Sequence, residues 1–506
     1  MDIIMECKNV DYSYPLTTEP AIKHLNLQIE RGKFYGVIGE NGSGKTTLCA
    51  LLRGFAPSFY KGEIKGEVLV EGKNINEYGG ELSQKIGFVF QNPFTQISGV
   101  KDTVFEEVAY GLENFGVPVE EIERRVIEVM KMTNIESLAE KNPFELSGGQ
   151  MQRVALASVI VLEPDILIID ESHRLRQRYG LASPGDYKAF DHKNEILGLG
   201  KKGTELDWIL RKSKYQFFFY DSGQSIKPTD VDPERFFLLL QNKHNYKYKL
   251  TSQLRCKGGN DYIQYIQNIL NCKQKSKITF KEYDLKLYED VDDMISEIKK
   301  KNKEVGLCRN IAGYAWDWKT KGKSLSSIIK ENLFDIEING YKYIWNRTDT
   351  DWINSPNSIN EIGCIHTTQG FDLNYAGIIL GPEIDYDNEK NRIFIYKKRY
   401  KDNKGKMGIE NDSILLAYIK NIYTTILERG LEGTYIYVCN DSLRNYLKQF
   451  FPVIKHNTEK LLFTEKVKTI EICEDIIPED QFSEYLPLYT IQAACGYFGE
   501  GDEVNK

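Results

Sequence analysis

The sequence contains no long apolar run, no secretion signal and no closely spaced cysteine pair. No stretch of its 506 residues approaches the ~18 apolar residues that a membrane-spanning helix needs. The opening segment, MDIIMECKNV, carries acidic side chains early and lacks the basic start of a secretory signal. The nine cysteines are odd in number and form no CxxC motif. These absences argue against a disulfide framework or a zinc site, and they predict a cytoplasmic protein with reduced thiols.

The net charge of −7 is unevenly distributed along the chain. The balance is −10 over residues 1–172, +10 over residues 173–456 and −7 over residues 457–506. A basic middle between acidic flanks favours a phosphate-rich partner for residues 173–456. The plain alternative for that segment is a solvated, lysine-rich surface.

The strongest signal is a glycine-rich loop between an apolar strand and a helix. In FYGVIGENGSGKTTLCALLRG, the strand covers residues 34–38 and the loop leads into the helix. The glycines let successive backbone N–H groups turn around phosphates at the helix N-terminus. Lys45 would reach the β- and γ-phosphates, and the Thr46 hydroxyl would bind Mg²⁺. The predicted cofactors are ATP and Mg²⁺, and the predicted contacts are Gly39, Asn41, Gly42, Ser43, Gly44, Lys45, Thr46 and Thr47.

Five further positions fit the same chemistry in chain order. Tyr14 precedes the loop, where an aromatic ring could stack on adenine. Gln91 ends the strand in IGFVFQ and could sense Mg²⁺ and the γ-phosphate, and Ser147 opens the helix in SGGQ. Asp170 and Glu171 end the buried strand in DILIIDE. Asp170 would hold Mg²⁺, and Glu171 would polarise the attacking water.

On these motifs, residues 3–171 resemble the ATPases of ABC transporters, in particular the energy-coupling-factor branch of cobalt and vitamin importers. The resemblance implies that Tyr14 stacks on adenine and that Gln91 is the Q-loop glutamine. It also implies that Ser147 begins a signature motif, Ser147–Gln150, which contacts ATP held by a partner subunit. A membrane transporter subunit would then be a partner, and the protein would be peripheral to the membrane.

The resemblance ends at the Asp-Glu pair. ABC ATPases continue with a Pro-Thr-Ser-Gly-Leu-Asp type segment, whereas this chain continues with Ser172-His173-Arg174-Leu175. About 30 residues later, where the family has a strand that ends in a γ-phosphate-sensing histidine, residues 198–206 read LGLGKKGTE. The D-loop and the H-loop of an ABC ATPase are therefore missing, which puts an ABC-type hydrolytic dimer in question.

The middle of the chain carries a second series of nucleotide-site motifs. SKYQFFFYDSGQ is an aromatic strand that ends at Asp221, with Gln224 just beyond it. Arg255 follows a later strand, and Arg429 lies between a helix and the last predicted strand. An arginine in that place could stabilise charge on the γ-phosphate. The rings of AGYAWDW could stack on bases, although such rings more often belong to a core.

In this order, residues 170–440 resemble the last two-thirds of the Schlafen-like DNA/RNA helicase domain family, which is similar to superfamily 1 helicases. The resemblance rests on DESHRLRQR, AGYAWDW and IHTTQG. It implies single-stranded DNA or RNA as a partner of residues 173–456. Glu428 replaces the threonine that usually precedes the arginine and glycine of ILERG, and the family's own P-loop segment is absent.

Together the motifs predict an α/β fold of P-loop NTPase type, with an ABC-type nucleotide-binding domain and a helicase-like second RecA-like domain. The expected boundaries are 1–172 for the ABC-type domain, 173–230 for the rest of the first helicase domain, 231–456 for the second helicase domain and 457–506 for an acidic tail. The expected catalytic residues are Lys45, Asp170, Glu171, Gln224 and Arg429, and the expected metal ligands are Thr46 and Asp170.

Three hypotheses follow for the whole chain. The first is a hybrid NTPase in which the ABC P-loop serves the helicase-like remainder. The second is an ABC transporter subunit with an unrelated appendage. The third is a chimera without a function as a unit, because the two families surround their P-loops with different strand orders and insertions, and conflicting topology frustrates folding.

Overall fold

The protein is described here by a computed structural model, which covers residues 2–15, 17, 19–39, 42–90, 95–146, 148–181, 184–212, 215–242, 245–250, 256–348, 352–368, 371–403 and 405–456. The chain divides into a compact unit, Met1–Lys455, and a second unit, His456–Lys506, of which only His456 is described.

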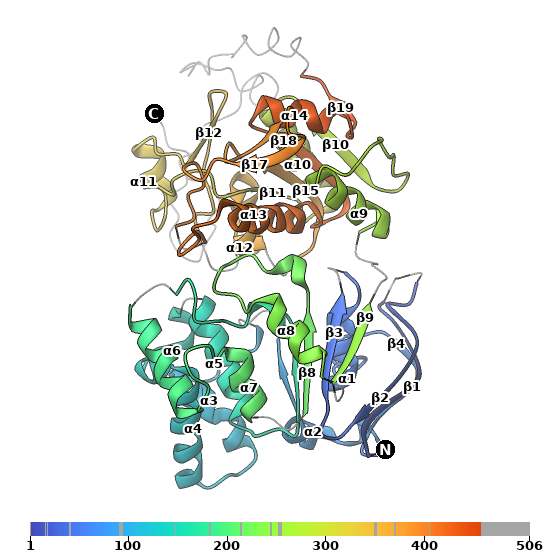
Figure 1. Cartoon of the computed structure of the whole chain (residues 1–506), viewed down its shortest axis with the longest axis vertical. Coiled ribbons are helices and arrows are strands. Elements are labelled where there is room, and N and C mark those ends of the chain that lie inside the picture. Colours follow the sequence, from blue (N-terminus) through green and yellow to red (C-terminus); the bar gives the residue numbers. More distant parts are fainter. Residues whose placement is uncertain are drawn as a thin grey trace, which may run out of the picture. The chain divides into compact units, whose positions relative to one another are not determined.

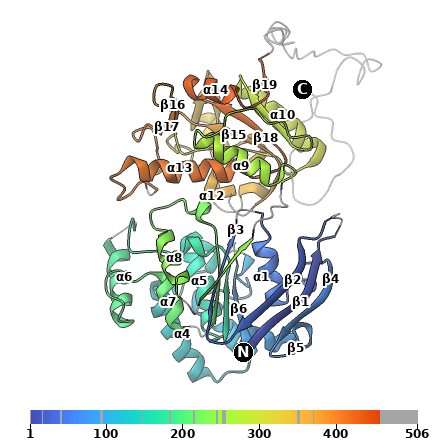
Figure 2. The same cartoon turned by 45° about the vertical axis from the view of Figure 1, so that its right-hand side comes forward.

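A four-stranded antiparallel sheet begins the chain, in the order β2-β1-β4-β5. Its inward side chains form one apolar cluster with the helix α1, Lys45–Arg53, whose residues 48–52 are buried. Figure 2 shows β1, β2 and β4 as a layer beside α1. The strands are β1 Ile3–Ser13, β2 Ile22–Glu30, β4 Glu63–Val70 and β5 Lys73–Asn74.

A five-stranded parallel sheet carries the glycine-rich loop, in the order β6-β7-β8-β3-β9. Its strands are β3 Phe34–Gly39, β6 Ile86–Val89, β7 Ile166–Ile169, β8 Tyr215–Tyr220 and β9 Asn245–Leu250. Strand β8 lies between β3 and β7 and pairs in parallel with both. The first three strands in chain order precede the join at the Asp-Glu pair, and β8 and β9 follow it (Figure 1). Both halves of the sequence therefore build one RecA-like sheet, which confirms the predicted fold class.

Aromatic side chains pack across the join between the two halves. Phe34 of β3 stacks on Phe218 of β8 with ring centroids 5.2 Å apart. Tyr35 stacks on Phe217 at 4.8 Å and on Tyr246 of β9 at 4.9 Å, with interplanar angles of 3° and 12°. Such contacts add to the stabilisation from burial of the rings alone.

The first sheet also extends beyond residue 230, where the sequence suggested a domain boundary. Helix α8, Pro233–Leu240, packs Leu240 against β3, where a Cβ on Gly36 would lie 2.7 Å from the leucine. Strand β9 then pairs with β3 along its length, from Phe34–Asn245 to Gly39–Leu250. The boundary was placed too early because NYKYKL is polar and exposed, as suits an edge strand but not a buried one.

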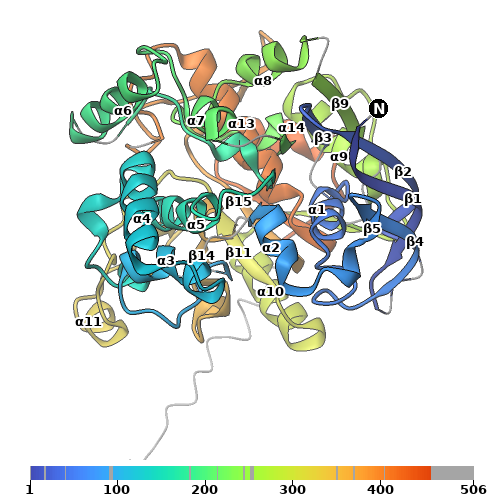
Figure 3. The same cartoon turned by 90° about the horizontal axis from the view of Figure 1, so that it is seen from below.

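Three helices form a separate apolar cluster: α3 Val104–Asn114, α4 Val119–Thr133 and α5 Gly148–Ile160. Thr103 and Glu106 form a capping box at the start of α3, which supplies partners for the first backbone N–H groups. Figure 3 shows these helices gathered on one side and β1, β2 and β4 on the other. The first half of the unit also contains α2 Leu82–Lys85, α6 Pro184–Ile196 and α7 Glu205–Lys212.

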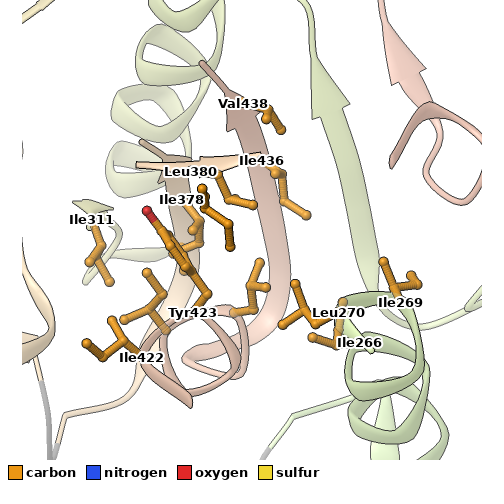
Figure 4. Close-up of a cluster of buried hydrophobic side chains, with 14 of the residues drawn as sticks. Ile266, Ile269, Leu270, Ile311, Ile378, Leu380, Ile422, Tyr423, Ile436 and Val438 are labelled. Carbon is orange, nitrogen blue, oxygen red and sulfur yellow. The ribbon is translucent and has the colours of Figure 1, made fainter. Parts of the chain in front are cut away.

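A six-stranded parallel sheet forms the second half of the unit, in the order β14-β11-β15-β18-β10-β19. Isoleucine and leucine side chains from this sheet, from α9 and from α13 meet in its core (Figure 4). Its strands are β10 Asp284–Tyr288, β11 Arg309–Ala312, β14 Ile362–Gly363, β15 Leu373–Leu380, β18 Gly430–Val438 and β19 Val453–Ile454.

Helices and two small hairpins complete this half. The helices are α9 Gly259–Leu270, α10 Val291–Val305, α11 Leu325–Lys330, α12 Ile365–Thr368, α13 Asp412–Leu427 and α14 Asp441–Lys448. The hairpins are β12 Ile336–Ile338 with β13 Tyr341–Tyr343, and β16 Ile384–Asp387 with β17 Arg392–Ile395.

Glu383 is a buried carboxyl from which we expect a pH dependence of stability in this half. It is fully buried beyond the end of β15, and the Tyr423 hydroxyl donates a hydrogen bond to its carboxyl. Burial raises the pKa of Glu383 to about 7. Because the folded pKa lies above the unfolded value, stability is greatest below the unfolded pKa and is lost as the pH rises through 7. We expect a loss of about 2 kcal/mol between pH 5 and pH 8, measured by urea unfolding.

The Glu383→Gln variant should lack this part of the pH dependence, because glutamine carries no titrating group. The exposed Glu410 offers a matched control, and Glu410→Gln should keep the wild-type profile. A Glu383→Gln protein that still loses stability over this range would show that another group is responsible.

Candidate nucleotide site at the carboxyl end of the first sheet

The glycine-rich loop connects β3 to α1 and has the backbone shape of a phosphate cradle. Gly42 and Gly44 have φ of 80° and 85°, in the left-handed region that glycine adopts without strain. A Cβ on Gly39 would lie 2.3 Å from the Ser43 hydroxyl, so only glycine fits there. The buried Ser43 hydroxyl has no hydrogen-bond partner among the described residues. The loop thus presents a buried polar group at the N-terminus of α1, where anions are favoured.

Lys45 and Thr46, the first two residues of α1, contact acidic residues from two different strands. The Lys45 ammonium group donates to the Gly39 carbonyl at 2.8 Å and lies 3.7 Å from a carboxylate oxygen of Asp221. The Thr46 hydroxyl donates to Asp170 at 2.8 Å. Asp170 follows β7 and Asp221 follows β8, and the carboxyl ends of parallel strands meet at one edge of a sheet. The predicted Lys45, Thr46 and Asp170 therefore lie together.

Asp170 and Glu171 are adjacent buried carboxyls with opposite pKa shifts. Burial and the charge of Glu171 raise the pKa of Asp170. Burial also acts to raise the pKa of Glu171, but the neighbouring His173 and Arg174 outweigh it and lower that pKa. Glu171 lies 3.2 Å from the His173 ring and 3.3 Å from the Arg174 guanidinium group. The two cationic neighbours of Glu171 thus favour its ionised form.

Gln224 is held in place by Asp221. Its side-chain amide donates to the Asp221 carboxylate at 2.9 Å, and the other carboxylate oxygen accepts from the backbone of Gly223 at 3.0 Å. Gln224 is 3% exposed, and its amide oxygen has no hydrogen-bond partner among the described residues. Gln224 lies at the carboxyl end of β8, and its buried amide oxygen can accept a hydrogen bond from a donor group that enters the site.

A cavity opens beside the Asp-Glu pair, between α5 and the ends of β6 and β7. Polar and charged side chains from both halves of the sequence meet in it. Its lining consists of Val89, Gln152, Arg153, Leu156, Ile169, Asp170, Glu171, Leu175, Arg176 and Glu205. Glu205 pairs with Arg176 at 2.8 Å. The cavity leaves room for a small polar molecule next to both carboxyls.

The remaining predicted residues fall into two groups. Tyr14 lies against the loop, because its hydroxyl is 3.0 Å from the Thr47 hydroxyl. Asn41, Gln91, Ser147 and Arg255 lie outside the described residues, so their predicted places stay predictions.

Arg429 lies at the start of the second sheet. It is fully buried between α13 and β18, and its guanidinium group donates to the Phe371 carbonyl at 3.1 Å. Its predicted role at the γ-phosphate stays a prediction. The aromatic residues of AGYAWDW (Tyr314, Trp316 and Trp318) are partly buried against an apolar cluster, as the plainer interpretation holds.

The residues after Gln224 connect the nucleotide site to the second sheet. The Asn421 amide of α13 donates to the Ser225 carbonyl at 3.0 Å. Ile226 is 4% exposed and belongs to the apolar cluster of the second sheet. A movement of Gln224 would therefore displace groups that are packed into the other half of the unit.

Asp221 and His173 were missed as site residues by the sequence interpretation. Asp221 was recognised, with Gln224, in the second series of nucleotide-site motifs, but its contact with Lys45 was not predicted. His173 is fully buried against Glu171. Only the sequence pattern of the helicase family has a histidine in this place, and that pattern does not indicate the contact with Glu171.

Comparisons with known proteins find two families, and the match to the helicase family also includes the Lys45 loop and the Asp-Glu pair. The Schlafen group 3 DNA/RNA helicase domain matches residues 33–440. A putative ABC transporter ATP-binding protein of Pyrococcus horikoshii is 43% identical over 271 residues, which cover 50% of this chain and 90% of the relative. The chain belongs to both families. It is a P-loop NTPase that joins an ABC ATPase to a Schlafen-type helicase domain.

Other relatives of this hybrid NTPase match its ABC part. An energy-coupling factor transporter ATP-binding protein of Oenococcus oeni is 40% identical over 170 residues, 33% of the hybrid and 59% of the relative. The solved structure of cbiO1 from Clostridium perfringens, described as part of the ABC transporter complex cbiONQ, is 30% identical. It covers 45% of the hybrid and 81% of its own chain, with a TM-score of 0.34. None of the described helices combines the length and apolar character of a membrane span.

Proposed function

We propose that the hybrid NTPase binds ATP with Mg²⁺ at the Lys45 loop, hydrolyses it, and couples hydrolysis to single-stranded nucleic acid through its second sheet. The observation that carries the proposal is the convergence of Lys45, Asp170 and Asp221 on one sheet edge. The first two residues come from the ABC part, and Asp221 comes from the helicase part.

The donor groups of the site suit a nucleotide triphosphate and Mg²⁺. The Thr46 hydroxyl and the Asp170 carboxylate are the hard oxygen ligands that Mg²⁺ prefers, and they already lie 2.8 Å apart. The buried Ser43 hydroxyl and the glycine turns supply polar groups for phosphate oxygens. Tyr14, beside Thr47, is the proposed adenine-stacking ring, and Gln91 and Ser147 are proposed contacts by family resemblance. When bound, Mg²⁺ would neutralise phosphate charge.

Glu171 is the proposed general base. Its carboxylate is held ionised by His173 and Arg174, and it faces a cavity that can admit water. A carboxylate in this place can orient the water and accept its proton. Lys45 would draw charge from the phosphates, and Gln224 would sense the γ-phosphate through the N–H donors of its side-chain amide.

The contacts of Gln224 favour coupling to the second sheet over coupling to a membrane subunit. The end of β8 carries Asp221 and Gln224. From there the chain runs directly to Ser225 and Ile226, which are bound to α13 and the second core. Transport coupling remains the second candidate, since the ABC relatives are transporter subunits.

An Asn421→Ala variant tests this coupling. We expect ATP hydrolysis by the wild type to rise about fivefold or more with single-stranded DNA or RNA. In Asn421→Ala the basal rate of hydrolysis should persist. The stimulation factor should be about fivefold smaller than in the wild type, because one hydrogen bond to Ser225 is removed. The exposed Asn445 is a matched control on α14, and Asn445→Ala should behave as the wild type.

The alternatives give different results in the same assay. Stimulation by a reconstituted energy-coupling-factor membrane subunit, with none by nucleic acid, would support a transporter subunit. No hydrolysis under any condition would support a chimera without a function as a unit.

A further inference from the structure

We propose that Asp221 is a counter-ion that holds Lys45 in the nucleotide-free protein and must release it when a phosphate binds. This inference rests on the proposed function, because it concerns how the same site admits ATP. Asp221 would be a positioning residue, since it acts on the nucleotide through Lys45. Its effect would be to weaken the binding of ATP.

The first observation is the buried ion pair itself. The Lys45 ammonium group lies 3.7 Å from the Asp221 carboxylate, and the two side chains are 6% and 9% exposed. Charges that are shielded from water attract each other more strongly than the same charges at a surface. Salt also screens them less. Lys45 therefore cannot turn to the β- and γ-phosphates without giving up an attraction that solvent does not replace.

The second observation is that Asp221 is fixed from the other side. One carboxylate oxygen accepts from Gly223 at 3.0 Å, and the oxygen that faces Lys45 also accepts from Gln224 at 2.9 Å. These bonds hold the carboxylate at the end of β8, whereas Lys45 would only have to exchange its Gly39 carbonyl and Asp221 contacts for a phosphate. Lys45, with its long and flexible stem, is thus the partner that moves.

The third observation is the sign of the surrounding charge. Asp170 and Glu171 follow the neighbouring strand β7, and the charge of Lys45 acts on the pKa of both carboxyls. With Asp221, three carboxyls lie near the ammonium group. A phosphate that binds here adds negative charge beside these three carboxyls. Removal of one carboxylate therefore favours the binding of the phosphate.

The Asp221→Asn variant removes the charge and keeps the shape. The asparagine oxygen can still accept from Gly223, and its amide can donate to the acceptor of Gln224 that is now unused. We expect the variant to bind a fluorescent ATP analogue with Mg²⁺ about tenfold more tightly than the wild type, because no ion pair has to break. In steady-state assays KM should fall while kcat does not rise. A merely structural role would weaken binding or leave it unchanged.

Asp441→Asn is the control for net charge, because Asp441 lies on α14 with its side chain 86% exposed. Its affinity should equal that of the wild type. Asp221→Ser serves as a second variant, since a serine hydroxyl can cap the same turn without a charge. Thermal unfolding checks that each variant is folded.

The outcomes separate the inference from the proposed function. A folded Asp221→Asn or Asp221→Ser protein that binds the analogue no more tightly than the wild type overturns the inference. Unfolding of both variants also overturns it, because the ion pair would then be a requirement for folding. Failure of the wild type and Asp441→Asn to bind the analogue overturns the proposed function instead.

Discussion

Replacing Phe218 by alanine is expected to lower the free energy of unfolding by about 3–5 kcal/mol. Phe218 is fully buried in β8, the strand that joins the two halves of the first sheet. It stacks on Phe34 of β3 at 5.2 Å and meets Phe236 of α8 edge-on at 6.1 Å. Its removal would leave a cavity between a strand of the ABC part and a helix of the helicase part.

The measurement is thermal and urea unfolding with and without ATP. A ligand that binds only the folded protein shifts the transition of the part that binds it. The transition that ATP shifts should move to lower temperature in Phe218→Ala. Phe59 is a matched control, because it is 71% exposed in the ABC part. Phe59→Ala should change stability by less than about 0.5 kcal/mol.

This variant separates a joined fold from a juxtaposition of two fragments. If the ABC part folded without β8, Phe218→Ala would leave the ATP-shifted transition in place. Such a result would support a transporter subunit with an appendage, or a chimera. A large loss would show that the nucleotide loop depends on a strand encoded after the join.

Much of the first sheet could be predicted because its signals are local. The apolar residues of β3 and β7 and the glycines between β3 and α1 lie in short continuous segments. Their chemistry follows from residue type and spacing. For the same reason Lys45, Thr46 and Asp170 could be predicted as a group, and the structure brings them together.

The contacts that connect the halves depend on tertiary packing, which no local pattern reports. Lys45 and Asp221 meet because β8 is inserted between β3 and β7, a fact of strand order and not of spacing. The strand before Arg255 was expected, but its place beside β3 at the edge of the first sheet was not. The bond between Asn421 and Ser225 spans 196 residues and has no motif at all.

The position of the join explains why two families can share one sheet. Strand β7 ends in the Asp-Glu pair that both families use. The two strands that follow β7 in the sequence, β8 and β9, pair with the two edges of β3. Strand β8 fills the gap between β3 and β7, and β9 covers the free edge of β3. Since ligands bind beyond the carboxyl ends of such strands, residues from either family reach the same nucleotide. The functional difference then lies in what β8 carries at its end.

Glu171→Gln is expected to slow ATP hydrolysis by about 10²–10⁴-fold while ATP binding persists. Glutamine has nearly the shape of glutamate and can still bond to His173, but it cannot accept a proton from water. The pKa of Glu171 is lowered from the usual carboxyl range, which already lies below pH 6. Protonation of Glu171 should therefore not reduce the wild-type rate between pH 8 and pH 6.

Single-turnover hydrolysis and nucleotide titration on the same samples separate the two effects. Glu163 is a matched control, since it precedes β7, has the same left-handed backbone as Glu171 and is 67% exposed. Glu163→Gln should hydrolyse ATP at the wild-type rate. A Glu171→Gln protein that retained wild-type turnover would mean that another group activates the water. Glu205, which lines the same cavity and is not a proposed metal ligand, would then be the next carboxylate to replace.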